Sequence, residues 1–222
     1  MSLNPIWVFL EIGQTRTFAV VPHWPGWCRS GGSEDAALRA LLEYAPRYAQ
    51  ALTGSGLEFP DALSLIDLQV EGKVVGNATT DFGAPAMPLP PDDLLVSEDE
   101  LAYMQVLLAA SWAAFDRAAQ AAEGKSMRTG PRGGGRDLAK MVAHVGEAEL
   151  AYLSKLGGKM PLDSRDDQTR RRVMLETLAA SVQGGIPAVG PRGGGRWTPR
   201  FFVRRTAWHT LDHAWEIEDR IE

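Results

Sequence analysis

The order of hydrophobic and polar residues predicts strands in the first part of the chain. Residues 6–12 and 17–21 are short runs rich in β-branched and aromatic side chains, which is typical of strands. Residues 13–16 between them are turn-like, so the two strands are expected to pair as a hairpin. Residues 63–70 predict another strand, and residues 72–82 predict a turn, a strand and a loop.

The first helix is predicted to begin at Ser33, after a proline- and glycine-broken loop at residues 23–28. Ser33 is a suitable N-cap, and Glu34 and Asp35 follow it in the first turn, where acidic residues are favourable. The apolar residues that continue at helical spacing are Leu38, Leu41, Leu42, Ala45 and Tyr48.

Residues 85–91 mark the clearest boundary, because four of these seven residues are proline. A proline-rich stretch cannot be the interior of a helix and favours an extended, stiff connection. Beyond it the apolar spacing becomes helical, and Ser97 with Glu100 fits a capping box. Four helices of roughly 20 residues each are predicted from this spacing. They cover about residues 97–122, 136–156, 163–182 and 198–221.

These elements predict an α+β protein with two domains. A small α/β domain is expected at residues 1–84, a proline-rich linker at residues 85–96, and a four-helix bundle at residues 97–222.

Three of the four histidines, His144, His209 and His213, fall within predicted helices. The four-residue spacing of His209 and His213 places both imidazoles on one helix face, one turn apart. A third imidazole from another helix would complete a set of nitrogens that binds Zn²⁺, Ni²⁺ or a similar ion and leaves positions for water or substrate. The alternative is that all three are ordinary surface or core histidines. His23 is expected to be structural or exposed.

The last predicted helix carries two distinct stripes. His209, His213 and Glu216 share one stripe, and His144 on its own helix has Glu147 three residues on. Each glutamate is a candidate partner of a metal ligand, a candidate catalytic base acting on metal-bound water, or a surface charge. The other stripe is apolar, predicts core packing, and consists of Trp208, Leu211 and Trp215.

The sequence around these histidines resembles a known family. The segments MVAHVGEAELAYL and AWHTLDHAWEIEDR resemble the DinB/YfiT-like family of four-helix proteins. That family commonly has one histidine on its second helix and an HxxxH pair on its last, which His144, His209 and His213 match. The resemblance covers residues 97–222 and implies a crossover between the second and third helices, a divalent metal near one end and frequent homodimers. Some members are S-transferases that use low-molecular-weight thiols such as bacillithiol or mycothiol. Others are metal-dependent hydrolases or isomerases, and many have no known activity.

Residues 5–83 resemble HicB-like antitoxin domains. The resemblance rests on the strand pair, on the turn at Pro25 and Gly26, and on the helix that opens with Ser33. It implies an α/β fold and does not imply a toxin partner.

The motif GPRGGGR occurs twice, at residues 130–136 and 190–196, and each copy leads into a helix with candidate ligand histidines. Consecutive glycines let backbone N–H groups converge on an anion beside a helix N-terminus. The alternative is a pair of turns with solvated arginines, and the spacing matches neither the P-loop nor the dinucleotide-binding motif. The arginines that would contact a carboxylate or phosphate are Arg132, Arg136, Arg192 and Arg196.

Composition narrows the classes of function. The net charge of −5 argues against nucleic-acid binding by charge alone. The single cysteine, Cys28, cannot form an internal disulfide, so a reducing, cytoplasmic setting is expected. The first residues lack a basic segment, and no run of about 18 apolar residues occurs, so neither a signal peptide nor a membrane span is expected.

Three kinds of function remain open on the sequence. The first is a metal-dependent transferase or hydrolase, in which the metal activates a water or a thiol supplied by a small cosubstrate. The second is a non-catalytic metal-binding or stress-response protein with a structural metal. The third is a regulatory protein whose N-terminal domain contacts another protein or a nucleic acid. Cys28 is a poor candidate nucleophile, because nothing in the sequence connects it to the histidines.

Overall fold

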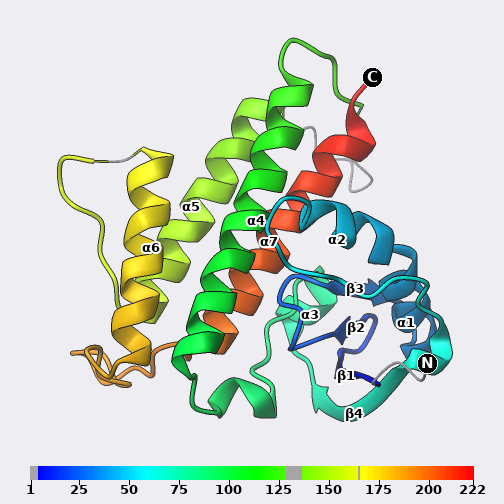
Figure 1. The fold of residues 1–222 in the computed structure, drawn as a ribbon, viewed down its shortest axis with the longest axis horizontal. Coiled ribbons are helices and arrows are strands. Elements are labelled where there is room, and N and C mark those ends of the chain that lie inside the picture. The colour runs from blue at the N-terminus through cyan, green and yellow to red at the C-terminus, as the bar shows by residue number, and fades with distance from the viewer. Residues whose placement is uncertain (1–4, 129–136, 165) are drawn as a thin grey trace. The chain divides into compact units, whose positions relative to one another are not determined.

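The computed structural model describes residues 5–128, 137–164 and 166–222, and these residues form an α+β protein (Figure 1). The chain divides into two compact units, a first unit Met1–Leu94 and a second unit Leu95–Glu222. The sheet belongs to the first unit, and four long helices belong to the second. Among the described residues, no helix has the length and apolar character needed to cross a membrane.

A four-stranded sheet organises the first unit. β1 and β2 are antiparallel, with Ile12 opposite Thr17, so the predicted hairpin is confirmed. β2 is also antiparallel to β3, whereas β1 and β4 are parallel. β3 lies where no strand was predicted, because its sequence CRSG has no apolar pattern. In the spatial order β3-β2-β1-β4, the strands are β3 (Cys28–Gly31), β2 (Thr17–Val20), β1 (Ile6–Ile12) and β4 (Leu68–Val75).

β4 begins at Leu68 instead of residue 63, so the prediction of a strand at 63–70 was wrong in its bounds. A local hydrogen-bond pattern explains the shift. The backbone N–H of Ser64 donates to Asp67 Oδ2 over 2.8 Å, and this capping box sets a short 3₁₀ helix, η1 (Leu65–Asp67), before the strand. Such a side-chain cap competes with strand pairing.

The first helical region is split in two. α1 (Glu34–Glu43) begins where it was predicted, and the side chain of Ser33 accepts a hydrogen bond from the backbone N–H of Ala36 over 3.2 Å. α2 (Ala45–Ala51) follows after Tyr44, and it has a proline in its first turn. Proline is tolerated there because the first turn has no intrahelical partner for the missing N–H.

The segment after β4 folds back onto the sheet. It forms α3 (Ala78–Phe82), where a loop was predicted. The carboxylate of Glu11 in β1 is fully buried and accepts hydrogen bonds from Thr80 Oγ1 at 2.5 Å, from the backbone N–H of Ala86 at 2.8 Å and from that of Met87 at 3.1 Å. A buried carboxylate requires such donors. The start of the proline-rich segment is therefore tied to β1.

The rest of the proline-rich segment is also ordered by local contacts. Leu89 is buried, and its backbone N–H donates to Asp92 Oδ2 over 2.7 Å at the start of the 3₁₀ helix η2 (Pro90–Asp93). The boundary between the two units falls between Leu94 and Leu95, inside the segment 85–96 that was predicted as a linker.

The second unit contains four long helices that pack on one another. α7 packs against α4 and α5, and α6 packs against α5. The predicted capping box begins α4, where the backbone N–H of Glu100 donates to Ser97 Oγ over 3.2 Å. The largest difference from the predicted starts is at α6, which begins four residues after residue 163 because Asp166 caps it. The helices are α4 (Glu98–Ala122), α5 (Leu138–Leu156), α6 (Asp167–Val182) and α7 (Pro199–Arg220).

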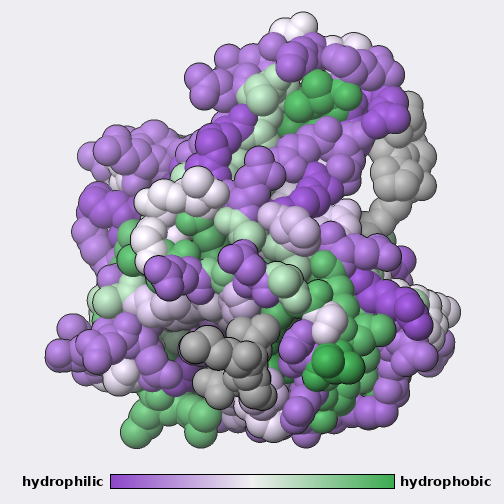
Figure 2. Space-filling model, turned by 45° about the vertical axis from the view of Figure 1, so that its right-hand side comes forward, coloured by the Kyte–Doolittle hydropathy of each residue, from purple (hydrophilic) through white to green (hydrophobic). Residues whose placement is uncertain are grey.

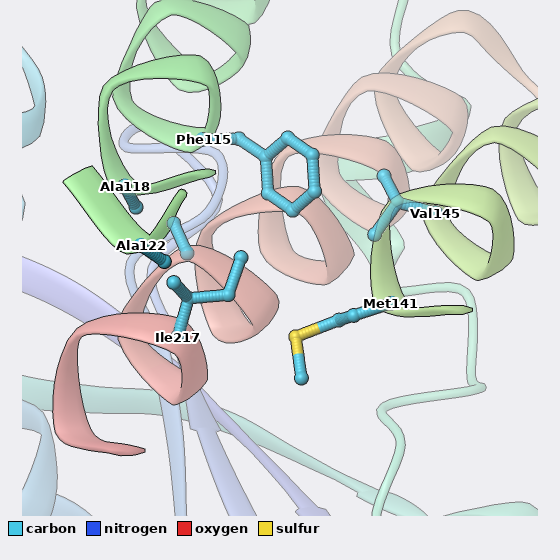
Figure 3. Packing of buried hydrophobic residues seen from close by; sticks show 7 residues of the cluster. Phe115, Ala118, Ala122, Met141, Val145 and Ile217 are labelled. Carbon is cyan, nitrogen blue, oxygen red and sulfur yellow. The ribbon is translucent and has the colours of Figure 1, made fainter. Parts of the chain in front are cut away.

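A hydrophobic cluster fixes α4, α5 and α7 relative to one another (Figure 3). Phe115 from α4 lies between Val145 of α5 and Ile217 of α7 in this close view, and Met141 closes the cluster. Each of these four side chains is at most 3 % exposed. Burial of large apolar side chains is the main favourable term for helix packing, so this cluster sets which faces of α5 and α7 meet.

The face of the molecule in Figure 2 is mostly hydrophilic, with hydrophobic patches between the polar side chains. The exposed large apolar residues of the described chain include Trp7, Ile66, Val75 and Phe82 in the first unit. Apolar atoms contribute much of any protein surface, so these side chains by themselves indicate no function.

The stability of the helical unit is expected to fall in acid. Hydrogen bonds from the backbone N–H groups of Lys140, Thr169 and Ser97 lower the pKa values of Asp137, Asp166 and Glu100, in that order. A carboxyl with a lowered folded-state pKa contributes stability above its unfolded pKa of about 4, and this contribution is lost as the pH falls through the folded value.

Urea denaturation followed by circular dichroism at a series of pH values measures this loss. The double variant Asp137→Asn, Asp166→Asn keeps an N-cap on each helix but cannot ionise there. Its urea midpoint is expected to fall less steeply below pH ~4 than that of the unmodified chain. Equal slopes for the two proteins would show that these caps do not cause the acid sensitivity.

Candidate metal centre

Three imidazoles meet between α5 and α7. His144 comes from α5, and His209 and His213 come from α7. Each offers one ring nitrogen to a group whose atoms all lie within 4.8 Å of one another. The ring centroids are 5.2 Å apart for His144 and His209, 5.0 Å for His144 and His213, and 4.6 Å for His209 and His213. The three residues singled out from the sequence are thus brought together, and the cluster could hold a metal ion.

The spacing of the ring nitrogens suits a divalent ion. Nitrogens at about 2.1 Å from a tetrahedral metal lie about 3.4 Å from one another. Separations of at most 4.8 Å leave a difference that small side-chain rotations can close. No Asp, Glu or Cys of the described residues joins this group, and the remaining residues contain none of these types.

Two of the candidate ligands are next in sequence to buried core residues. His144 precedes Val145 and His213 precedes Ala214, and both apolar residues belong to the buried cluster of Figure 3. The predicted apolar stripe of α7 is confirmed, because each of its side chains is at most 4 % exposed. That stripe is Trp208, Leu211 and Trp215. Helix-borne ligands held by a packed core keep their directions better than ligands on loops.

Glu216 forms a chain of contacts with one of the candidate ligands. Its Oε2 lies 2.9 Å from His213 Nδ1, and its Oε1 accepts from Arg220 Nη1 over 2.9 Å. Arg220 Nε in turn donates to the backbone carbonyl of Arg128 over 2.7 Å. When the Nδ1 proton lies on the bond to Glu216, Nε2 of His213 keeps its lone pair for a metal. The hydrogen bond to His213 lowers the pKa of Glu216, and Arg220 adds to this effect.

The two glutamates considered from the sequence have different surroundings. Glu147 is exposed on α5, whereas Glu216 is partly buried against His213. Of the three roles considered, the geometry at Glu216 fits the partner of a ligand, and the exposure of Glu147 fits a surface charge. Both residues lie three positions after a histidine, so the sequence spacing alone does not separate them.

Glu216→Gln is expected to lower metal affinity about 10- to 100-fold, the usual effect of removing a carboxylate that orients a ligand histidine. Isothermal titration with Zn²⁺ after chelator treatment measures the change. Glu147→Gln is the matched control and is expected to leave affinity unchanged. If the two variants behave alike, the contact with His213 does not contribute to metal binding.

Aromatic side chains and one arginine border His209. The Tyr152 ring of α5 lies edge-on to the His209 ring at 5.7 Å and lies 5.1 Å from the Trp197 ring. The guanidinium carbon of Arg205 lies 5.5 Å from the centre of the Tyr152 ring and 4.6 Å from that of Trp208. Burial raises the pKa of Tyr152, so its phenol keeps the proton at neutral pH and remains a hydrogen-bond donor.

Tyr152, Trp197 and Arg205 were not singled out from the sequence. Arg205 lies four residues before His209, and Tyr152 lies eight residues after His144. Helical spacing places Arg205 on the face of the histidines, and that signal was available. The approach of Tyr152 to His209 depends on how α5 packs against α7, which the sequence pattern does not show.

A buried ion pair between α5 and α6 was also not predicted from the sequence. Glu149 of α5 accepts hydrogen bonds from Trp112 Nε1 and from Arg170 Nε, each over 2.7 Å. Its side chain is 1 % exposed and that of Arg170 is 7 % exposed. Gly146 permits the approach, because a Cβ there would already lie 3.2 Å from the guanidinium. These contacts connect α4, α5 and α6.

The second GPRGGGR motif forms a closed turn. The backbone N–H of Gly190 donates to the Gly194 carbonyl over 2.8 Å, and that of Gly193 donates to the Gly190 carbonyl over 2.9 Å. Arg196 Nη1 donates to the Pro187 carbonyl over 2.9 Å, and Arg192 is exposed. These contacts fit the alternative of a structural turn, and an anion-binding role stays a prediction. The first motif, with Arg132 and Arg136, lies outside the described residues.

The remaining two candidate residues of the sequence lie in the first unit. His23 is exposed, with its ring edge-on to Trp24 at 5.7 Å, and it is not part of the three-histidine group. Cys28 is buried in β3 at 1 % exposure.

Comparisons of this chain with family models, with curated proteins and with solved structures find no match. The function must therefore be argued from the site itself.

Proposed function

We propose that the second unit is a four-helix metal-binding module related to the DinB/YfiT-like family, and that it binds zinc or nickel through His144, His209 and His213. The observation that carries the proposal is the convergence of three helix-borne imidazoles within 4.8 Å. A donor set made only of imidazole nitrogens suits Zn²⁺ and Ni²⁺ better than Mg²⁺ or Ca²⁺, which prefer oxygen ligands.

The favoured activity is transfer of a small-molecule thiol. Hydrolysis is the second enzymatic activity that the proposed centre could support. Three protein ligands leave at least one position for water or a cosubstrate. When bound there, a divalent metal lowers the pKa of a thiol or a water and makes a nucleophile available near neutral pH. Hydrolysis usually also uses a protein base, but Glu147 is exposed and Glu216 is engaged with His213 and Arg220. A free thiol is already far more acidic than water, so a metal-bound thiol loses its proton at neutral pH without a protein base, which supports transfer.

The alternative is a non-catalytic protein with a structural metal, acting in binding or in a stress response. The observation that favours it is the low exposure of His209 and His213, 8 % each. A structural centre would be closed by a fourth ligand and would not admit a small molecule.

The first unit is proposed to be related to HicB-like domains. Its strand pair, its turn at Pro25 and Gly26, and its helix from Ser33 are the features on which that resemblance rests. The proposal includes no toxin partner. A homodimer of the chain is a further proposal that follows from the DinB-like resemblance.

Cobalt substitution separates an open centre from a closed one. We expect the apoprotein to bind one equivalent of Co²⁺ and to show visible absorption bands of a low-symmetry site. Addition of 2-mercaptoethanol is then expected to produce a new near-ultraviolet sulfur-to-cobalt charge-transfer band. Bound cobalt without that band would favour the structural alternative, and no stoichiometric cobalt would refute metal binding.

A further inference from the structure

Some side chains at or beside the three-histidine centre keep partial solvent exposure. His209 and His213 are buried, whereas His144, Tyr152 and Arg205 are only partly buried. Trp197, which packs against Tyr152, is also partly buried. Tyr152 and Arg205 therefore keep some solvent exposure beside the buried His209.

Arg205 is held in a fixed orientation. Its guanidinium lies over two aromatic rings, 5.5 Å from the centre of Tyr152 and 4.6 Å from that of Trp208. Both rings also lie near His209, at centroid distances of 5.7 Å and 6.1 Å. Aromatic stacking fixes the plane of a guanidinium. A pre-oriented arginine loses less conformational entropy when it binds a ligand.

The charge and shape of this arrangement favour a carboxylate. Arginine is always protonated, and its fork of N–H groups matches the two oxygens of a carboxylate in a bidentate pair. Arg205 lies one helical turn before His209 on the same face of α7, which places it within reach of a short molecule held at the imidazoles. The Tyr152 phenol beside it is a further hydrogen-bond donor.

We infer that Arg205 binds the carboxylate of a small anionic substrate or cosubstrate whose other end is held at the three-histidine centre. Arg205 is then a specificity-determining residue, and the substrate class is a short thiol or other metal-binding molecule that carries a carboxylate. The inference rests on the proposed metal binding at His144, His209 and His213.

The test uses the cobalt-loaded full chain and two matched pairs of thiols. Mercaptoacetate is compared with 2-mercaptoethanol, and 3-mercaptopropionate with 3-mercapto-1-propanol, by titration of the sulfur-to-cobalt charge-transfer band. At least one acid is expected to bind about tenfold or more tightly than its alcohol, because a charge-assisted bidentate contact is added. Arg205→Gln is expected to reduce that preference about tenfold and to leave the affinity for the alcohols and the cobalt stoichiometry unchanged.

The controls separate failure of this inference from failure of the proposed function. Arg172→Gln changes an exposed arginine of α6 that pairs with Glu176, and it is expected to keep the full preference. If both alcohols bind and neither acid binds more tightly than its alcohol, the role of Arg205 is overturned. It is also overturned if Arg205→Gln keeps the same preference for the acid as the unmodified chain. Absence of cobalt binding or of any thiol band would instead overturn the proposed function.

Discussion

Replacing His209 and His213 together with alanine is expected to abolish stoichiometric binding of a divalent metal. The substitution removes two of the three imidazoles that meet within 4.8 Å. His144→Ala alone leaves two ligands and is expected to lower affinity by more than the about 10- to 100-fold expected for Glu216→Gln. Elemental analysis and isothermal titration measure both effects.

His23→Ala is the matched control for this experiment. His23 is exposed in the first unit and stands outside the three-histidine group, so metal content should not change. Circular dichroism should establish that each variant keeps its helices. A metal that survives the double substitution would place the binding site elsewhere in the chain.

Metal binding is also expected to be lost in acid. A protonated imidazole cannot ligate a metal, so protons compete with the ion for each histidine. Metal retention measured by equilibrium dialysis should fall as the pH decreases through the range in which imidazoles take up protons. Retention that does not depend on pH down to about 4 would exclude histidine ligands.

The largest effect on stability is expected at Glu149. Glu149→Ala removes the carboxylate acceptor of the buried Arg170 Nε and of Trp112 Nε1, and it leaves Arg170 only its contact with the exposed Asp167. Breaking a buried ion pair by removing one partner costs about 3–5 kcal/mol. Urea denaturation should show this loss in the free energy of unfolding. The control Arg172→Ala removes an exposed pair with Glu176 and is expected to cost less than about 1 kcal/mol.

The pH dependence of the destabilisation caused by Arg170→Ala tests the same ion pair from the other side chain. Burial raises the pKa of Glu149, whereas Arg170 acts in the opposite direction, so removing Arg170 raises the pKa further. A carboxyl with a raised folded-state pKa favours the folded state below its unfolded pKa, and this contribution is lost as the pH rises through the folded value. The destabilisation by Arg170→Ala should therefore shrink as the pH falls toward about 4. A loss that does not change with pH would argue against a buried carboxylate as its cause.

Helix positions were predictable because their signals are local. The caps at Ser33 and Ser97 and the apolar spacing of α4, α5 and α7 depend on residues within a few positions of one another. Short elements were harder to predict. β3 carries no apolar pattern, so its pairing with β2 decides where it lies. The start of β4 is displaced by the capping box at Ser64, a local signal that the strand pattern does not include.

The candidate site was only partly predictable for the same reason. Glu147 and Glu216 stand at the same spacing from a histidine, but only Glu216 contacts one. Arg205 was within reach of a spacing argument, whereas Tyr152 comes to His209 from another helix. Glu149 was not singled out in the sequence, and its partners come from α4 and α6.

The sequence by itself determined that His209 and His213 share a face of α7, because the 3.6-residue period of the helix fixes this geometry. It also placed His144 on a separate helix. Only the tertiary structure decided that His144 meets the pair. That meeting requires α5 to turn one particular face toward α7, and the face is chosen by the packing of Phe115, Met141 and Ile217. Packing sums many weak contacts between distant segments, and no spacing within one helix contains that information.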